Sequence, residues 1–129
     1  MSTGARAVWI VDDDDSVRES LRGLLEAYNY DVRAFESSAA FLAAAGAERC
    51  DCLLLDLNLP PPTGLDILQR IRRRADAAVP VVIITGRGGK AARRRVLAAG
   101  ANAYLEKPFE GEELLKVVGA LTLQAAAHT

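Results

Sequence analysis

Cysteine and histidine are scarce in this chain of 129 residues, which has two cysteines and one histidine. Cys50 and Cys52 are spaced C-x-C, and His128 is the penultimate residue. A structural zinc site needs four ligands, so these three residues argue against one. Two cysteines without a disulfide framework are typical of a reducing compartment, and we therefore expect a cytoplasmic protein.

Long apolar runs are also lacking. No run approaches the roughly 18 residues that a membrane span requires, and the N-terminus has no signal-peptide core. The formal net charge of −1 argues against a strongly basic nucleic-acid binder. We expect neither a membrane nor direct nucleic-acid contact. The length indicates a single domain over residues 1–129, with a core at about 6–122 and a tail or linker start at 123–129.

Short continuous apolar runs recur along the chain, and helical periods separate them. Three strong runs and two weaker ones follow this pattern, at residues 8–11, 53–55 and 81–84 and at residues 32–35 and 103–105. Continuous rather than alternating runs are typical of parallel strands with helices on both faces. Five strand–helix pairs predict a doubly wound α/β domain with a five-stranded parallel sheet and five helices. We assume the flavodoxin-like strand order 2-1-3-4-5.

The helix starts can be read from capping residues. Ser16 and Glu19 can form a capping box for the first helix, although Asp14 or Asp15 could cap it instead. The apolar stripe expected on this helix consists of Val17, Leu21, Leu24, Leu25 and Tyr28. Ser37 and Thr63 are expected to cap the second and third helices, and Gly100 to end a fourth helix at about 89–99.

Polar residues that carry chemistry follow four of the five expected strands. Asp12–Asp15 follow the first run, Asp56 the third, Thr85 the fourth and Lys107 the fifth. In open α/β sheets, ligands bind beyond the carboxyl ends of the strands, so these groups should converge. Several adjacent carboxylates repel one another unless a hard cation such as Mg²⁺ neutralises them. Carboxylates, a cation, a lysine and a hydroxyl together indicate phosphoryl transfer to an aspartate.

Five stretches of the chain resemble the receiver domain of two-component response regulators, over about residues 6–122. They are Val11–Asp14 with Arg18, Leu55–Pro60 leading to Gly64, Ile84–Gly86, Ala99–Ala101 and Glu106–Phe109. Each stretch is a weak signal alone, but five in order are specific. The resemblance is nearest to regulators of the nitrogen-fixation and nodulation type. It implies a phosphorelay module that accepts a phosphoryl group and switches conformation.

The resemblance implies a Mg²⁺ site beside a phosphoacceptor. Asp56 would be the acceptor and a metal ligand. Asp13 would bind Mg²⁺ directly, Asp12 through water, and Asn58 through its main-chain carbonyl. The run of four aspartates leaves Asp14 as an alternative to Asp13.

The resemblance also assigns the residues that sense the phosphoryl group. Thr85 and Lys107 would hold the phosphoryl oxygens, and Tyr104 would change rotamer as Thr85 moves inward. The resemblance further implies a cis bond between Lys107 and Pro108, a geometry that X–Pro bonds reach at low cost.

The implied partners are a sensor histidine kinase or phosphotransfer protein, a downstream effector or covalently linked output domain, and a second copy on phosphorylation. We expect no substrate turnover, only catalysis of the domain's own phosphorylation and dephosphorylation. Regulators of the nitrogen-fixation and nodulation type usually carry a C-terminal helix-turn-helix, which these 129 residues lack. The chain is therefore expected to be either a free-standing receiver, which we slightly prefer, or a piece of a longer regulator.

Two alternative functions remain open. Asp12 and Asp14 also fit the opening motif of haloacid-dehalogenase-type phosphatases, although Thr85 and Gly86 stand where those enzymes need further acids. An adaptor that keeps the fold without phosphorylation is the other alternative. The basic strips at Arg70–Arg74 and Arg93–Arg95 indicate solvated helix faces or, more specifically, a docking surface on the fourth helix.

Overall fold

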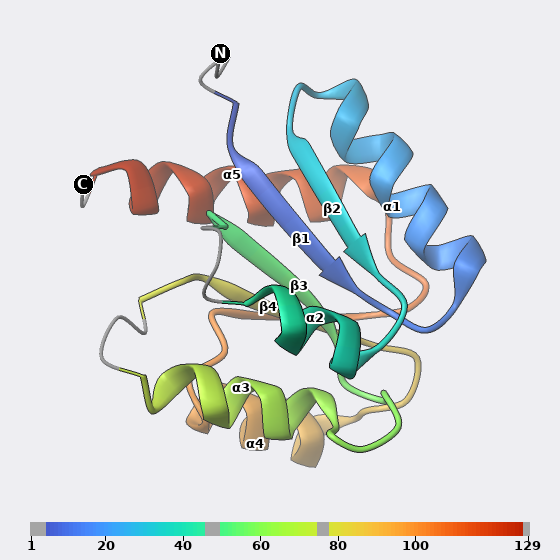
Figure 1. The fold of residues 1–129 in the computed structure, drawn as a ribbon, viewed down its shortest axis with the longest axis vertical. Helices are drawn as coiled ribbons and strands as arrows, with labels where there is room; N and C mark the ends of the chain where they lie inside the picture. The colour runs from blue at the N-terminus through green and yellow to red at the C-terminus, as the bar shows by residue number, and fades with distance from the viewer. Residues whose placement is uncertain (1–4, 46–49, 75–77, 128–129) are drawn as a thin grey trace.

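Strands and helices alternate strictly in the computed structural model, which describes residues 5–45, 50–74 and 78–127 (Figure 1). His128 lies outside the described residues. The strands are β1 (Ala7–Val11), β2 (Asp31–Phe35), β3 (Cys52–Asp56), β4 (Val81–Thr85) and β5 (Ala103–Glu106). The helices are α1 (Asp15–Ala27), α2 (Ser38–Ala44), α3 (Gly64–Arg72), α4 (Lys90–Ala98) and α5 (Gly111–Ala127).

The five strands form one parallel sheet in the order β2-β1-β3-β4-β5, which confirms the predicted fold class and strand order. The register pairs Val11 with Leu55 and Thr85 with Glu106. Neighbouring strands therefore end at about the same level. The polar residues that follow them reach a common edge.

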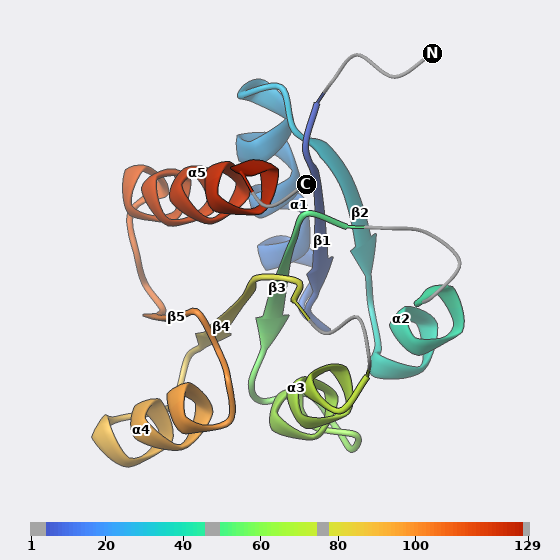
Figure 2. The ribbon, with the colours of Figure 1, turned by 90° about the vertical axis from the view of Figure 1, so that its left-hand side faces the viewer.

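Helices cover both faces of the sheet, with α1 and α5 on one side and α2, α3 and α4 on the other (Figure 2). Every residue of β3 and β4 is buried. This double coverage explains the continuous apolar runs in the sequence, because both sets of alternate side chains face a core. It also holds the central strand ends rigidly beneath the polar edge.

Three of the helix signals are confirmed, and for the first helix the structure selects one of the alternatives. Ser37 caps α2 and Thr63 caps α3, where Asp66 completes a capping box. Gly100, with φ of 108°, follows the end of α4 as expected. The first helix is capped by Asp14, whose side chain accepts from the Val17 amide, and not by the Ser16 capping box.

The ends of α1 and α5 differ from expectation. Tyr28 does not join the apolar stripe of α1, because it is the C-terminal cap and is 61% exposed. α5 continues to Ala127, past residue 122 where we expected the core to end. Among the described residues, none of the helices combines the length and the apolar composition that a bilayer-spanning helix needs.

Candidate functional site

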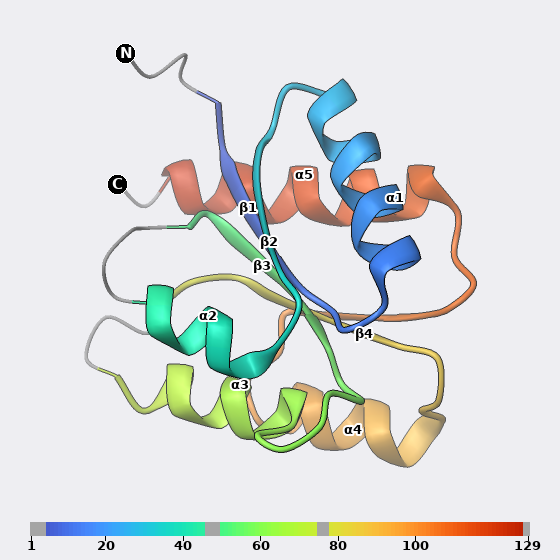
Figure 3. The same ribbon diagram turned by 45° about the vertical axis from the view of Figure 1, so that its right-hand side comes forward.

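Acidic side chains from two neighbouring strands meet at the carboxyl edge of the sheet. Figure 3 shows the loops that follow β1, β3 and β4 on the same side of the molecule. Asp12 and Asp13 follow β1, and Asp56 is the last residue of β3. Their carboxylate oxygens lie within 4.8 Å of one another. The structure therefore brings together the acids that the sequence analysis selected.

A pocket of about 460 Å³ opens at this edge. It is lined by the three clustered acids and by five further residues, Asp14, Asn58, Gly86, Arg87 and Lys107. The loops after β1, β3, β4 and β5 all contribute to it. This convergence follows from the strand order, because β1, β3 and β4 are consecutive in the sheet.

Asp12 forms the buried ion pair of the site. Its carboxylate is almost fully buried, and its Oδ2 accepts from Lys107 Nζ at 3.0 Å. Its Oδ1 accepts from the Asp14 amide at 2.9 Å. Arg18 donates to the Asp12 carbonyl and pairs with Asp15, which fixes the start of α1. Both oxygens of Asp12 are thus already engaged within the protein.

Asp56 differs from Asp12 in having one carboxylate oxygen without a partner. Asp56 is 6% exposed, and its Oδ1 accepts from the Asn58 amide at 3.0 Å. Among the described residues, no hydrogen bond reaches its Oδ2. Burial raises the pKa of Asp56, and the charges of Asp12 and Asp13 add to this. The hydrogen bond from the Asn58 amide and the charge of the Lys107 ammonium act in the other direction and lower the pKa of Asp56.

The donor set fits a hard divalent cation. Mg²⁺ prefers oxygen ligands and usually takes one or two carboxylates while retaining water. Asp13 is exposed, and Asp56 has a free oxygen, so both can offer a carboxylate. Both carboxylate oxygens of Asp12 already accept hydrogen bonds, so a contact from Asp12 to a cation through a water molecule is better suited than direct binding. The Asp14 carboxylate accepts from the Val17 amide as a helix cap, which favours Asp13 over Asp14 as the direct ligand.

Thr85 is fully buried beside Gly86 and is not among the residues that line the pocket. Its hydroxyl donates to the Arg87 carbonyl at 2.5 Å and accepts from the Asn58 side-chain amide at 2.6 Å. The Arg87 amide also donates to the same oxygen at 3.0 Å. This side-chain link of Asn58 between the loops after β3 and β4 was not predicted from the sequence.

Tyr104 lies on β5 with its hydroxyl outside the acidic pocket. It donates to Glu106 Oε1 at 3.1 Å, and Glu106 also accepts from the Gly89 amide at 3.1 Å. Burial and the Glu106 carboxylate raise the pKa of Tyr104. A Cβ atom at residue 88 would lie 1.6 Å from the Tyr104 hydroxyl oxygen, so only Gly88 leaves room for it. Sequence reasoning missed Gly88 and Glu106, although the Gly88–Gly89 pair could have drawn attention to this loop.

The backbone behind the acceptor also requires a glycine. A Cβ atom on Gly64 would lie 2.4 Å from the Asp56 carbonyl oxygen, which leaves no room for a side chain. The Ser38 hydroxyl donates to the Pro62 carbonyl at 2.6 Å and ties the proline loop to α2. The Lys107–Pro108 bond is cis as predicted, and the Pro61–Pro62 bond is cis as well.

Comparisons with known proteins identify the family of this chain. Residues 8–119 match the family model of the response regulator receiver domain. The chain is 33% identical over 120 residues to response regulator protein TodT of Pseudomonas putida, which covers 93% of the chain and 52% of TodT. It is 36% identical over 115 residues to nodulation protein W of Bradyrhizobium diazoefficiens, and this match covers 89% of the chain and 50% of nodulation protein W. The chain thus spans about half the length of the curated relatives it matches.

Solved structures show the same fold. A CheY-like receiver domain protein from Methanospirillum hungatei superposes with a TM-score of 0.90 at 25% identity, covering 98% of this chain and 100% of that one. A putative response regulator from Chloroflexus aurantiacus gives a TM-score of 0.87 at 33% identity, covering 92% and 98%. Phosphorylation on an aspartate and use of Mg²⁺ are general features of this family. The chain belongs to the response regulator receiver domain family.

Proposed function

We propose that Asp56 is the phosphoacceptor of this receiver domain. The single observation that carries the proposal is the asymmetry of its carboxylate. Oδ1 is held by the Asn58 amide, whereas Oδ2 has no partner among the described residues and belongs to a pocket-lining side chain. Oδ2 attacks the phosphorus atom, the bond from phosphorus to the donor breaks, and an acyl phosphate forms on Asp56.

The neighbouring residues stabilise the charge that this transfer brings in. Lys107 is anchored by Asp12 at the pocket and would lie beside the phosphoryl oxygens. Asp13, Asp56 and the Asn58 carbonyl would hold Mg²⁺, with Asp12 contacting it through water. When bound, the ion supplies the positive charge that lets acids and phosphoryl oxygens share one site.

The switch would begin at Thr85. Its hydroxyl now donates to the Arg87 carbonyl, and a charged phosphoryl oxygen is a stronger acceptor. Turning the hydroxyl toward the phosphoryl group breaks this bond and frees the loop after β4, after which Tyr104 leaves Glu106. Moving such an equilibrium from 1:99 to 99:1 requires about 5.5 kcal/mol of differential stabilisation.

The proposed phosphoryl donor is a sensor histidine kinase or phosphotransfer protein, in the cytoplasm. The output would be an effector, a linked domain or a second copy of the chain. The domain would catalyse only its own phosphorylation and dephosphorylation. No acid follows β4 at Thr85 and Gly86, which argues against a phosphatase with turnover.

Mass spectrometry after treatment with acetyl phosphate and Mg²⁺ tests the acceptor. We expect one added phosphoryl group in the wild type and none in Asp56→Asn. Asp15→Asn is a matched control, because it removes an exposed carboxylate from the same edge. Modification that persists in Asp56→Asn would refute the assignment. Steady release of phosphate from nitrophenyl phosphate at catalytic protein concentration would instead indicate a phosphatase.

A further inference from the structure

Charge is divided very unevenly along this chain. Residues 67–105 contain nine of the 16 lysines and arginines but only one of the 17 acidic residues. This stretch runs from within α3 into β5 and carries a formal charge of +8, whereas the rest of the chain carries −9. The net charge of −1 therefore conceals a basic stretch and an acidic remainder of the chain. The four aspartates of the phosphoacceptor pocket belong to the acidic remainder, whereas Arg87 belongs to the basic stretch.

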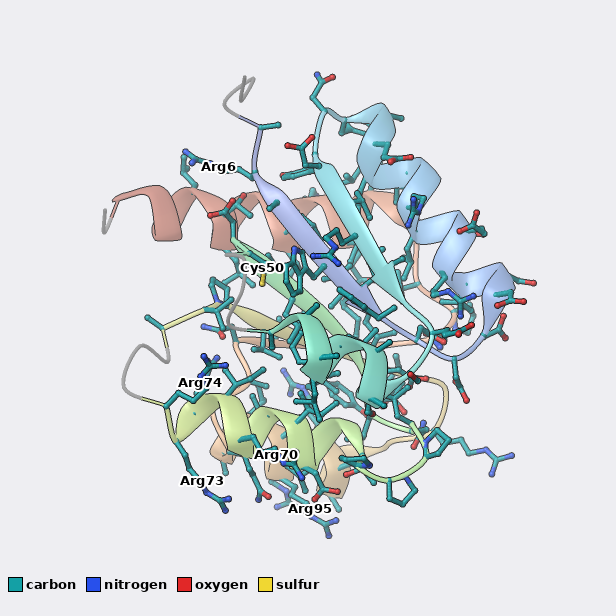
Figure 4. All side chains as sticks on the ribbon, in the orientation of Figure 1. Arg6, Cys50, Arg70, Arg73, Arg74 and Arg95 are labelled. Carbon is teal, nitrogen blue, oxygen red and sulfur yellow. The ribbon has the colours of Figure 1, made fainter. Side chains whose placement is uncertain are left out.

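Four arginines of the basic stretch form what we call the arginine surface: Arg70, Arg73, Arg94 and Arg95. All four are exposed. Figure 4 shows Arg70, Arg73 and Arg95 projecting from the lower side of the molecule, away from the sheet. α3 and α4 lie next to each other on that side in Figures 1 and 3 and share one hydrophobic core. The surface thus spans two neighbouring helices.

Two of these arginines contribute to their helices. Arg70 and Arg95 lie in the last turns of α3 and α4, where a cation interacts favourably with the helix dipole. The pKa of Asp66 is lowered by hydrogen bonds with Thr63 and, to a smaller extent, by the charge of Arg70. Such exposed contributions are small and do not require four arginines on one surface.

Among the described residues, no salt bridge joins any of the four arginines to an acidic group. Arg72 provides the contrast within the same strip, because its guanidinium donates to the carbonyls of Gly100 and Val79 and to the Asn102 side chain. Arg72 joins elements of the fold, whereas the arginine surface faces solvent.

The charge of α4 runs against the electrostatic rules that stabilise a helix, except for Arg95, which lies favourably in the last turn. Gly89 provides no side-chain cap, and Lys90 places a cation at the positive end of the helix dipole. The nine residues contain four cations and no acid, so no oppositely charged pair can form within the helix. Sequences break local rules in this way mainly where function requires it. The positive charge of α4 therefore needs an explanation outside folding.

We propose that the arginine surface is a docking site for a short acidic segment of a partner protein. Guanidinium groups bind carboxylates through two parallel hydrogen bonds, which suits arginine better than lysine. α3 and α4 have nine residues each and are about 14 Å long, so the surface is short. A long nucleic-acid strand would extend past the arginines of these two short helices. A short acidic segment fits within the surface. Because salt screens charges that are more than about 8–10 Å apart, only acids that lie directly on the arginines contribute to binding.

Fluorescence anisotropy with a labelled octaglutamate peptide tests the proposal. We expect salt-sensitive binding that weakens at least about tenfold in Arg94→Gln/Arg95→Gln. The control Arg6→Gln/Lys116→Gln removes the same charge from exposed residues outside the arginine surface and should bind as the wild type does. Arg70→Gln/Arg73→Gln should weaken binding as well, because α3 contributes half of the surface.

Three outcomes would overturn the docking site. One is equal weakening in both charge-matched variants, which would indicate attraction by net charge alone. Another is tighter binding of a thymidine oligonucleotide than of the peptide, with the same dependence on Arg94 and Arg95. The third is absence of peptide binding at low salt by a protein that still accepts a phosphoryl group. An unchanged circular dichroism spectrum of each variant shows that lost binding is not lost folding.

Discussion

Asp12 shows how one residue can serve both the fold and the site. It is almost fully buried, and its two oxygens are divided between the Asp14 amide and the Lys107 ammonium. The first bond fixes the start of α1, and the second holds a cation beside the pocket. A buried carboxylate that loses such a partner keeps its full desolvation cost.

Replacement of Lys107 by methionine should therefore destabilise the protein. We expect a loss of about 1–3 kcal/mol, because Asp12 would remain buried without its cation while Lys107 itself is partly solvated. Urea denaturation in the presence of a metal chelator measures this loss without compensation by a bound cation. Lys116→Met, at an exposed position of α5, is the control. An unchanged midpoint in Lys107→Met would mean that the ion pair contributes nothing to folding.

Gly88 allows Tyr104 its position because it has no side chain that would overlap the ring. A methyl group there would overlap the tyrosine hydroxyl, so Gly88→Ala must displace the ring from Glu106. The pKa of Tyr104, now raised by burial and by Glu106, should then fall. An NMR titration of the Tyr104 ring resonances measures the change. Gly86→Ala is the control, because a Cβ atom there meets nothing within 4 Å. Ring resonances that match the wild type in Gly88→Ala would contradict this account.

Residue positions at the site could be predicted from the sequence, but their hydrogen bonds could not. Asp12, Asp56, Thr85 and Lys107 stand at the ends of apolar runs, and the parallel sheet brings such ends to one edge. The link from Asn58 to Thr85 depends instead on the conformation of two loops. No periodic pattern records loop conformation, so the sequence contains no direct signal for that bond.

At the scale of elements, α1 offers a clean test of helix propensity. Gly23 lies exposed within a helix of 13 residues, and a methyl group there meets nothing within 4 Å. Gly23→Ala should raise the free energy of unfolding by roughly 0.5–1 kcal/mol, because glycine loses more backbone entropy on folding. Thermal denaturation of both proteins at one pH measures the gain. A lower midpoint would contradict this account, since the structure shows nothing that a methyl group at this position would meet.

Element ends were harder to predict than element types. Asp14, Asp15 and Ser16 all have capping side chains, and sequence alone does not decide among adjacent candidates. The turn after β1 determines which residue caps the helix. The Asp14 amide donates to the Asp12 carboxylate, and in this position the Asp14 side chain accepts from the Val17 amide. Tyr28 extends the apolar period of α1 by one turn, but the helix ends before it at Ala27. The apolar period of a sequence can therefore continue past the residue at which the backbone ends the helix.

At the scale of the whole molecule, strand order concentrates negative charge at one edge. β1 and β3 are neighbours, so the acids that follow them meet although more than 40 residues separate Asp13 from Asp56 in the chain. Their mutual repulsion opposes folding when no cation is present. The stability of the entire domain should therefore depend on Mg²⁺, because a ligand that binds only the folded state stabilises it.

Asp13→Asn separates the repulsion among the acids from the stabilisation by Mg²⁺. Without Mg²⁺, the variant should melt at a higher temperature than the wild type, because one charge of the cluster is gone. Saturating Mg²⁺, at about 100 times its dissociation constant, adds about 2.7 kcal/mol to a protein that binds it. We expect this gain in the wild type and a much smaller one in Asp13→Asn. Glu26→Gln, an exposed change on α1 outside the cluster, should keep the full response. A full response in Asp13→Asn would move the second carboxylate ligand to Asp14 or Asp12, because these two and Asp56 are the only other acids of the described residues that line the pocket.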